Sequence, residues 1–242
     1  MWDRDLVART PRHKVARIPE FREVTYSATR WEILRRLRRD ASRLMKALKS
    51  CGLEPITHGS LARGDVNSKS DVDIVIPYRV QAFLVELCLE NHGIQALNRF
   101  IIQATPASTP KAYIEVDPSG LRTVSFPLSD LSPREWEFYR FGGMVNYEEL
   151  VRDVRVPGVS KSLVLIIPTE KGHIEAPVVG YEHYVAKVVS VSIETVVERV
   201  NVLTRRDRYG RTGVYLKYQL LSSESFEEAF NKLIESGRLK TS

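Results

Sequence analysis

The feature that most constrains this chain is the segment at residues 58–73, HGSLARGDVNSKSDVD, which lies between two short apolar runs. The second run is rich in valine and isoleucine, so residues 72–76 predict a β-strand, and residues 55–58 predict a shorter one. Alternate side chains of a strand share a face, so Asp71 and Asp73 are expected to project together. Adjacent carboxylates repel each other and are costly to bury unless a cation neutralises them. The pair therefore predicts a site for Mg²⁺, which binds carboxylate, phosphate and water oxygens.

A turn upstream of the aspartate pair offers the complementary half of such a site. Gly59 follows the shorter strand, and a glycine allows backbone N–H groups to approach a ligand closely. Consecutive N–H groups together with the Ser60 hydroxyl form a concavity suited to an anion. Arg63 and Lys69 add positive charge in the same loop. We therefore expect these four residues to bind phosphate groups, with a plain surface position as the alternative for Arg63.

Three other loop families fail on this segment. A P-loop requires Lys and then Ser or Thr after its second glycine, but Asp65 and Val66 stand there. The dinucleotide-binding pattern Gly-x-Gly-x-x-Gly is absent from the segment. An EF-hand requires oxygen ligands at alternate positions and a closing Glu, and the residues from Asp65 onward do not supply them.

The segment resembles the signature of the nucleotidyltransferase superfamily that includes DNA polymerase β. That signature is an apolar strand, Gly-[Gly/Ser], a short gap and Asp-x-[Asp/Glu] on the next strand, and residues 59–60 and 71–73 match it. GSLARG followed by SDVD is similar to the small, minimal members. The resemblance covers residues 29–126 and implies an α+β fold in which helices flank a palm-like mixed sheet. His58 departs from the family pattern, which has an apolar or aromatic residue there; a hydrogen-bonded strand-end histidine is expected, and a nucleotide contact is the alternative.

The resemblance also implies an activity. Such transferases move an NMP unit from an NTP to a hydroxyl-bearing acceptor and release pyrophosphate. They use two Mg²⁺ ions, for which Mn²⁺ can substitute, held by Asp71, Asp73 and a third acid. ATP is the expected NTP, bound through the glycine-serine turn with Arg63 and Lys69. A non-catalytic nucleotide- or RNA-binding relative is the alternative, and a module whose partner completes the site is a third interpretation.

The third acid is sought in KAYIEVDP at residues 111–118. Glu115 lies between two apolar residues, which favours an acid on the polar face of a strand. Asp117 would share that face, but Pro118 is expected to end the strand and leave Asp117 in the turn. The resemblance therefore implies Glu115 as metal ligand and base, whereas two ordinary exposed acids are the alternative.

The rest of the chain predicts an α+β protein with helices covering a sheet. We expect a basic arm at residues 1–28, a nucleotidyltransferase domain at 29–130 and a smaller mixed α/β region at 131–242, a candidate for binding the acceptor. The expected strands are 97–104, 111–116, 121–126, 163–167 and 174–179. The expected helices are one ending at Gly52, one at 80–92 with Phe83, Leu84, Leu87 and Cys88 inward, one at 132–150 interrupted at 142–143, one at 185–203 and one from Ser225 to Gly237.

Basic segments suggest a phosphate-bearing partner. The helix ending at Gly52 starts with a capping pair, Thr29 and Glu32, and one of its faces is crowded with arginine and lysine. The stretch RRDRYGRTG at 205–213 interleaves arginines with Tyr209, a pattern that suits contacts with RNA. With a formal net charge of +6, RNA is a candidate acceptor, whereas solvated surface is the ordinary alternative for both segments.

The two cysteines, Cys51 and Cys88, lack the spacing of a structural zinc site. Two unpaired thiols are typical of a reducing compartment. The first residues are charged where a secretory signal needs an apolar stretch, and no run approaches the length of a membrane span. We therefore expect a soluble cytoplasmic protein without a membrane partner.

Overall fold

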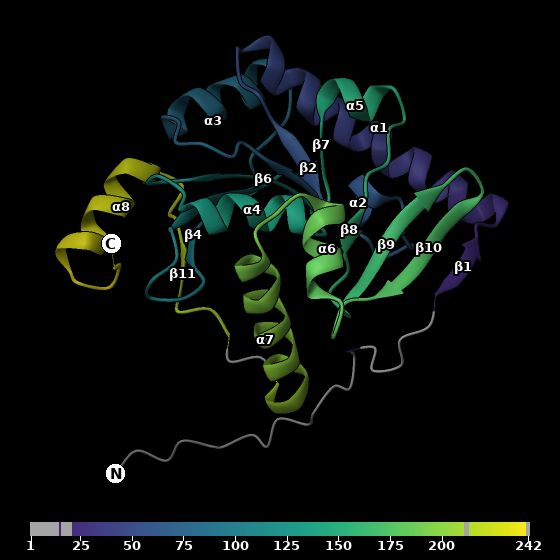
Figure 1. Ribbon diagram of the computed structural model, residues 1–242. Helices are drawn as coiled ribbons and strands as arrows, with labels where there is room; N and C mark the ends of the chain where they lie inside the picture. Colours follow the sequence, from purple (N-terminus) through teal and green to yellow (C-terminus); the bar gives the residue numbers. More distant parts are fainter. Residues whose placement is uncertain (1–14, 16–20, 211–212, 241–242) are drawn as a thin grey trace.

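The computed structural model describes residue 15 and residues 21–210 and 213–240. Most of the expected N-terminal arm therefore lies outside the described residues, as do residues 211–212 of the RRDRYGRTG stretch. In chain order (Figure 1), the elements are β1 (Arg22–Thr25), α1 (Ala28–Ser50), β2 (Ile56–His58), α2 (Ser60–Arg63), β3 (Val72–Val75), α3 (Ala82–Asn91), β4 (Asn98–Gln103), β5 (Lys111–Glu115), β6 (Arg122–Pro127), α4 (Pro133–Phe141), β7 (Met144–Asn146), α5 (Tyr147–Val151), β8 (Gly158–Val159), β9 (Val164–Thr169), β10 (Gly172–Pro177), α6 (Glu182–Val189), α7 (Ile193–Tyr209), β11 (Leu216–Gln219) and α8 (Phe226–Glu235).

The larger of two sheets contains seven strands in the order β11-β4-β5-β6-β3-β2-β7. Strands β3 and β6 run parallel, and the other neighbouring pairs are antiparallel, so the sheet is mixed as expected. One face packs against α1, α3 and α8 in the main hydrophobic core, to which β3 contributes Val72 and Ile74. Because alternate strand residues point to opposite faces, Asp73 lies on the other face.

The smaller sheet is antiparallel, in the order β1-β10-β9-β8, and packs with α6 and α7 around a second core. Helix α4 connects the two sheets. Its Tyr139 packs with Ile56 and Val75 of the larger sheet, while its Phe141 belongs to the second core. Helix α4 therefore covers part of the face on which Asp73 lies and fixes one sheet against the other.

The α+β fold class is confirmed, but the two sheets combine segments that the expected division at residues 28 and 130 would separate. Strand β1, expected to be irregular chain, pairs with β10 of the smaller sheet. Strands β7 and β11, both beyond residue 130, pair with β2 and β4 of the larger sheet. The expected helix at 185–203 is two helices, because Ser190 adopts a left-handed conformation (φ 54°) that ends α6.

Two details of the expected helices were wrong. The side chain that caps α1 is that of Ser27, which accepts from the Arg30 N–H at 3.2 Å, and not that of Thr29. Helix α3 turns Phe83, Leu84 and Leu87 toward solvent, with 53%, 44% and 49% of their surface exposed. It buries Ala82, Val85 and Leu89 instead, together with Cys88, whose inward position was predicted correctly. The helix is apolar on nearly all sides, so periodicity alone does not select its inner face.

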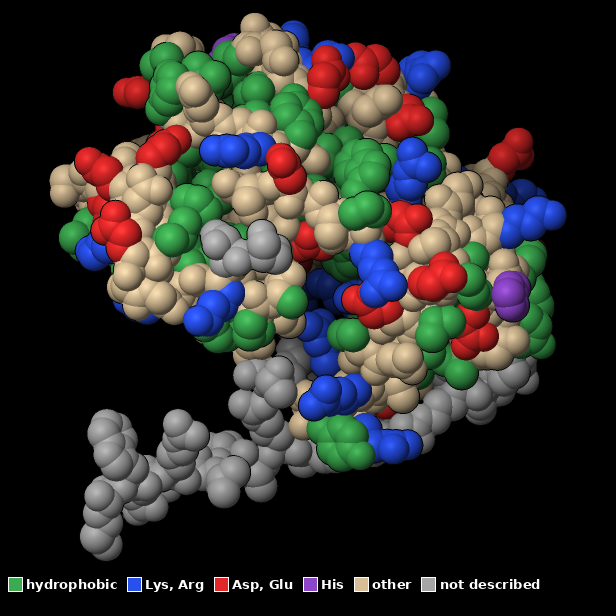
Figure 2. Space-filling model, turned by 60° about the vertical axis from the view of Figure 1, so that its left-hand side comes forward, with side chains coloured by type: hydrophobic (Ala, Val, Ile, Leu, Met, Phe, Trp, Pro, Cys, Tyr) green, Lys and Arg blue, Asp and Glu red, His purple; other side chains and the backbone are tan. Residues whose placement is uncertain are grey.

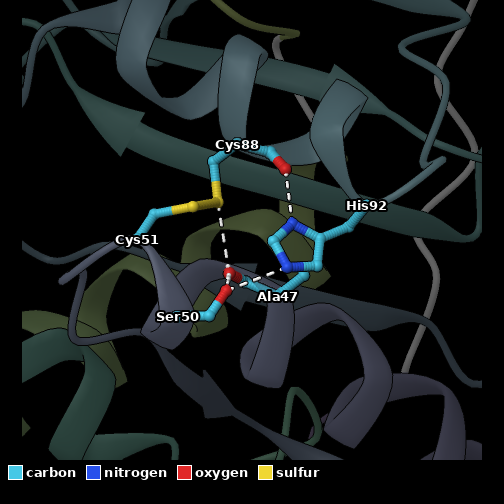
Figure 3. The surroundings of a disulfide bond; sticks show 5 residues. All are labelled: Ala47, Ser50, Cys51, Cys88 and His92. Atoms are coloured by element: carbon cyan, nitrogen blue, oxygen red, sulfur yellow. Dashed lines mark hydrogen bonds between the residues drawn. A yellow bond between two sulfur atoms is a disulfide. The ribbon is translucent and has the colours of Figure 1, made fainter.

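Cys51 and Cys88 form a disulfide with Cα atoms 6.2 Å apart, which joins the end of α1 to α3 (Figure 3). The expectation of two unpaired thiols was therefore wrong: helix packing brings together residues that are 37 positions apart. The argument for a reducing compartment loses its basis, since it depended on unpaired thiols. Among the described helices, none has the length and apolar character needed to cross a membrane.

Candidate functional site

The glycine-serine turn and the aspartate pair meet at one edge of the larger sheet. Strand β2 runs antiparallel to β3, so the residues that follow β2 lie beside the residues that begin β3. The Thr57 hydroxyl donates to the Asp73 carbonyl oxygen at 3.0 Å, which ties the two strands together at this edge. The chain thus places Gly59 and Ser60 next to Asp71.

Gly59 has a backbone conformation that suits glycine alone. Its φ is 78° and its ψ is −144°, and its N–H donates to the Gly143 carbonyl at 2.8 Å. A Cβ built at Gly59 would meet no atom within 4 Å. The glycine is therefore required by the turn and not by crowding, and the space in front of it is open to a ligand. Ser60, half-buried, is the first residue of α2.

The aspartate pair is partly shielded from water and carries mutual repulsion. Asp71 is largely exposed, while Asp73 is half-buried and accepts at 2.8 Å from the Thr123 hydroxyl. Partial burial and then the Asp73 carboxylate raise the pKa of Asp71, whereas Lys161 acts in the opposite direction. Two hard oxygen ligands in repulsion fit a divalent cation such as Mg²⁺ or Mn²⁺.

Glu115 lies on the same face of the sheet as Asp73, but on β5, which is separated from β3 by β6. The strand register pairs Asp73 with Thr123, and Thr123 with Glu115. Two strand spacings amount to about 10 Å between the backbones of the two acids. The Glu115 carboxylate accepts from the Asn98 side-chain amide at 2.8 Å, on the side away from Asp73. In the described part of the chain, Asp71, Asp73 and Glu115 are not among the groups of three whose ligand atoms all lie within 4.8 Å.

Asp117 lies in the turn between β5 and β6, as predicted from Pro118. Its carboxylate accepts from the Arg122 N–H at 2.7 Å and from the Ser119 hydroxyl. These hydrogen bonds and the Arg122 charge outweigh burial and lower the pKa of Asp117. The Asp117 carboxylate therefore stabilises the turn between β5 and β6.

The surroundings of Arg63 do not agree with the expected phosphate contact, because its guanidinium group is buried and already hydrogen-bonded. Only 5% of Arg63 is exposed, and two of its guanidinium nitrogens donate to the two Asp65 oxygens, each at 2.9 Å. Its Nη1 donates to the carbonyl of Gly142 at 2.6 Å and to that of Val159 at 3.3 Å. These acceptors engage the guanidinium, so Arg63 connects α2 to the chain after α4 and to β8. Lys69, in contrast, is exposed in the turn before β3.

His58 lies in an aromatic cluster. Its ring centroid is 5.8 Å from that of Phe138 and 5.1 Å from that of Tyr139, both on α4. Burial, followed by the charges of Lys111, Arg63 and Lys161, lowers the pKa of His58 to about 4. The imidazole is therefore neutral at neutral pH. Its ring contacts α4, which favours a structural role for this residue.

Three residues of this edge gave no signal of a role here in the sequence, although Gly143 was expected to interrupt a helix. Lys161, exposed between β8 and β9, acts electrostatically on both Asp71 and His58, although it is distant in the chain. Gly143 binds the Gly59 N–H, and a Cβ at Gly158 would lie 2.4 Å from the Gly143 nitrogen. The two glycines permit β8 to pack against the chain that holds the turn, which places Lys161 at the site.

Comparison with known proteins agrees with this geometry. A family model described as "Nucleotidyltransferase domain" matches residues 34–98, from within α1 to the start of β4. The match encloses Gly59, Ser60, Asp71 and Asp73. Searches of curated proteins and of solved structures returned no match.

Proposed function

We propose that this chain, which carries a nucleotidyltransferase domain, transfers an NMP unit from an NTP to a hydroxyl-bearing acceptor and releases pyrophosphate. One observation carries the proposal: the glycine turn after β2 and the carboxylate pair at the start of β3 lie at the same sheet edge. A phosphate-holding turn beside a cation-holding pair suits a metal-bound triphosphate.

In this proposal Asp71 and Asp73 hold Mg²⁺, or Mn²⁺ in its place. The metal would neutralise the charge that develops on the attacking and leaving oxygens of the phosphoryl group. Thr123 orients the Asp73 carboxylate through its 2.8 Å hydrogen bond. Ser60 and the turn bind the triphosphate, and Lys69 and Lys161 supply positive charge near it.

Glu115 is proposed as the base that accepts the proton of the acceptor hydroxyl. The proposal is supported by its position on the same face of the sheet as Asp73, in register through Thr123. An acceptor hydroxyl seated over Thr123 would lie between the two acids. Asn98 orients the Glu115 carboxylate and would be its positioning residue.

RNA is the proposed acceptor class, and ATP the proposed NTP. Arg35, Arg36, Arg39, Arg43 and Lys46 are exposed on α1 and form no ion pair within the described residues. Figure 2 also shows a hollow near the middle of one face where Lys and Arg side chains gather. Because α1 covers the sheet face opposite Asp73, an RNA that contacts α1 would have to extend around the domain to reach the site.

A second candidate function is nucleotide or RNA binding without transfer. The observation in its favour is that Thr123, and not an acid, stands directly beside Asp73 on the adjacent strand. A cation held by two carboxylates binds a triphosphate, but a base is still required to take the proton of the acceptor.

The test is incubation of the full chain with each α-labelled NTP, Mg²⁺ and separate pools of RNA, protein and small metabolites. Transfer predicts label in one pool, with ATP as the preferred donor, and loss of that label in Asp73→Asn. Retention of nucleotide by the protein without label in any pool would favour the binding function. Lys240→Ala, a change distant from the proposed site, is the control for nonspecific effects of lost charge.

A further inference from the structure

A second group of metal-ligating side chains lies outside the proposed nucleotide site, at the junction of α1 and α3 (Figure 3). Cys51 caps α1, Cys88 belongs to α3 and His92 caps α3. One ligand atom from each of the three lies within 4.8 Å of the others. We propose that, when the disulfide is reduced, these three side chains bind a thiophilic divalent cation, Zn²⁺, which then joins α1 to α3 in place of the disulfide.

The hydrogen bond of the His92 side chain suits a metal ligand. Its Nδ1 lies 2.8 Å from the Cys88 carbonyl oxygen, which accepts only if Nδ1 carries the proton. The lone pair is then on Nε2. A backbone carbonyl that fixes the tautomer in this way is the usual support of a metal-binding histidine.

The Nε2 lone pair of His92 and the carbonyl oxygen of Ala47 compete for the single hydroxyl proton of Ser50. Nε2 lies 2.9 Å from the Ser50 hydroxyl, which also donates to the Ala47 carbonyl at 2.7 Å. Ser50 has one hydroxyl proton, so one of the two acceptors lacks it at any moment. In the described part of the chain, no other hydrogen-bond donor faces Nε2. A cation at this position would satisfy the nitrogen without taking the proton from Ala47.

The contacts of Cys88 differ between the thiol and the metal-bound thiolate. Its Sγ lies 3.2 Å from the Ala47 carbonyl oxygen, a contact that becomes a hydrogen bond when Cys88 is a thiol and is given up when the thiolate binds the metal. Tetrahedral zinc has ligand bonds of about 2.0–2.3 Å, which places neighbouring ligand atoms about 3.5–4 Å apart. The three ligand atoms lie within 4.8 Å of one another, close to the spread of such a set. Cys51 and His92 are exposed, so water can take the fourth position.

Formation of the metal site begins with reduction of the disulfide. A phosphine reductant with water converts the disulfide to two thiols and becomes a phosphine oxide. Zinc binding then releases the thiol protons, and two thiolates neutralise the two positive charges of the metal. Either link closes the segment between Cys51 and Cys88, which contains the glycine turn and the aspartate pair. The inference does not depend on the proposed transfer activity.

The test compares oxidised and phosphine-reduced full-length protein after the reductant is removed. Co²⁺ is titrated as a spectroscopic substitute for Zn²⁺, and the thermal midpoint is measured with and without Zn²⁺. We expect one Co²⁺ per reduced chain with a thiolate charge-transfer band, no such band in the oxidised chain, and a Zn²⁺-dependent rise in the midpoint of the reduced chain alone. His92→Gln, which leaves both cysteines intact, should weaken Co²⁺ binding by more than about tenfold. His183→Gln, an exposed histidine on α6, is the matched control.

Two results would overturn the inference. One is a reduced chain that binds no more Co²⁺ than the oxidised chain, including a reduced chain that unfolds and is not restored by Zn²⁺, as followed by circular dichroism. The other is unchanged affinity and spectrum in His92→Gln.

Discussion

Replacement of Arg63 by alanine separates a structural role of this residue from a phosphate contact. Arg63 and Asp65 are buried as a pair, with 6% and 13% of their side-chain surfaces exposed. The substitution leaves the Asp65 carboxylate without its partner and removes the donor from the carbonyls of Gly142 and Val159. We expect the main effect to be a loss of folding stability.

The magnitude follows from the burial of the pair. Removal of one partner of a buried ion pair costs about 3–5 kcal/mol, chiefly because the other charge remains buried and unpaired. We expect about 4 kcal/mol for Arg63→Ala, a large part of the roughly 5–15 kcal/mol by which native proteins are stable. Removal of Asp65 as well should recover part of this loss, because no unpaired carboxylate then remains.

The assay is equilibrium urea unfolding of the wild type, Arg63→Ala, Asp65→Ala and the double variant. Arg35→Ala, an exposed position on α1, is the control and should change stability by less than about 0.5 kcal/mol. The double variant should be more stable than the sum of the single losses predicts. A stable Arg63→Ala protein whose KM for NTP has risen would refute the structural role and restore the phosphate contact.

Three further predictions concern stability. Cys51→Ser should lower the free energy of unfolding under oxidising conditions by about 4 kcal/mol, because the disulfide closes a loop of 37 positions; chemical denaturation checks this, and a change below about 1 kcal/mol would contradict it. The folded-state pKa of His58, about 4, lies below its usual value of 6.5, so the unfolded chain binds the proton first as the pH falls. The free energy of unfolding should therefore fall by as much as about 3 kcal/mol between pH 6.5 and pH 4, and His58→Phe should remove this dependence. Gly158→Ala should destabilise by at least about 1–3 kcal/mol, because its Cβ would lie 2.4 Å from the Gly143 nitrogen; an unchanged melting midpoint would show that the two segments separate easily.

Local patterns in the sequence were sufficient for β2 to β6 of the larger sheet, but not for β7, which lies inside the expected helix at 132–150, or for β11, where no strand was expected. The alternation around Asp73, the glycine turn and the capping box of Ser225 with Glu228 all depend on neighbouring residues, and the structure contains the predicted β3, turn and α8. The inner face of α3 could not be predicted in this way. Phe83 and Leu87 are as apolar as the residues that α3 buries, and contact with α1 decides which of them face inward.

The remaining features depend on contacts between distant segments. Arg63 resembles a loop cation in the sequence, but chain from beyond α4 supplies the carbonyls that engage it. The disulfide requires α1 and α3 to pack side by side, and Lys161 reaches the aspartate pair only because β8 packs on Gly143. Glu115 matched the expected face of its strand, yet the register shows Thr123 between it and Asp73.

The central claim is that the glycine turn and the aspartate pair together bind a metal-bound triphosphate for transfer. Pyrophosphate release from ATP and Mg²⁺, in the presence of the acceptor pool that takes up label, tests it most directly when wild type is compared with Asp73→Asn at equal folded concentration. We predict steady release by the wild type and only background release by Asp73→Asn, with the two proteins unfolding at similar urea concentrations. Equal release by both proteins would contradict the account.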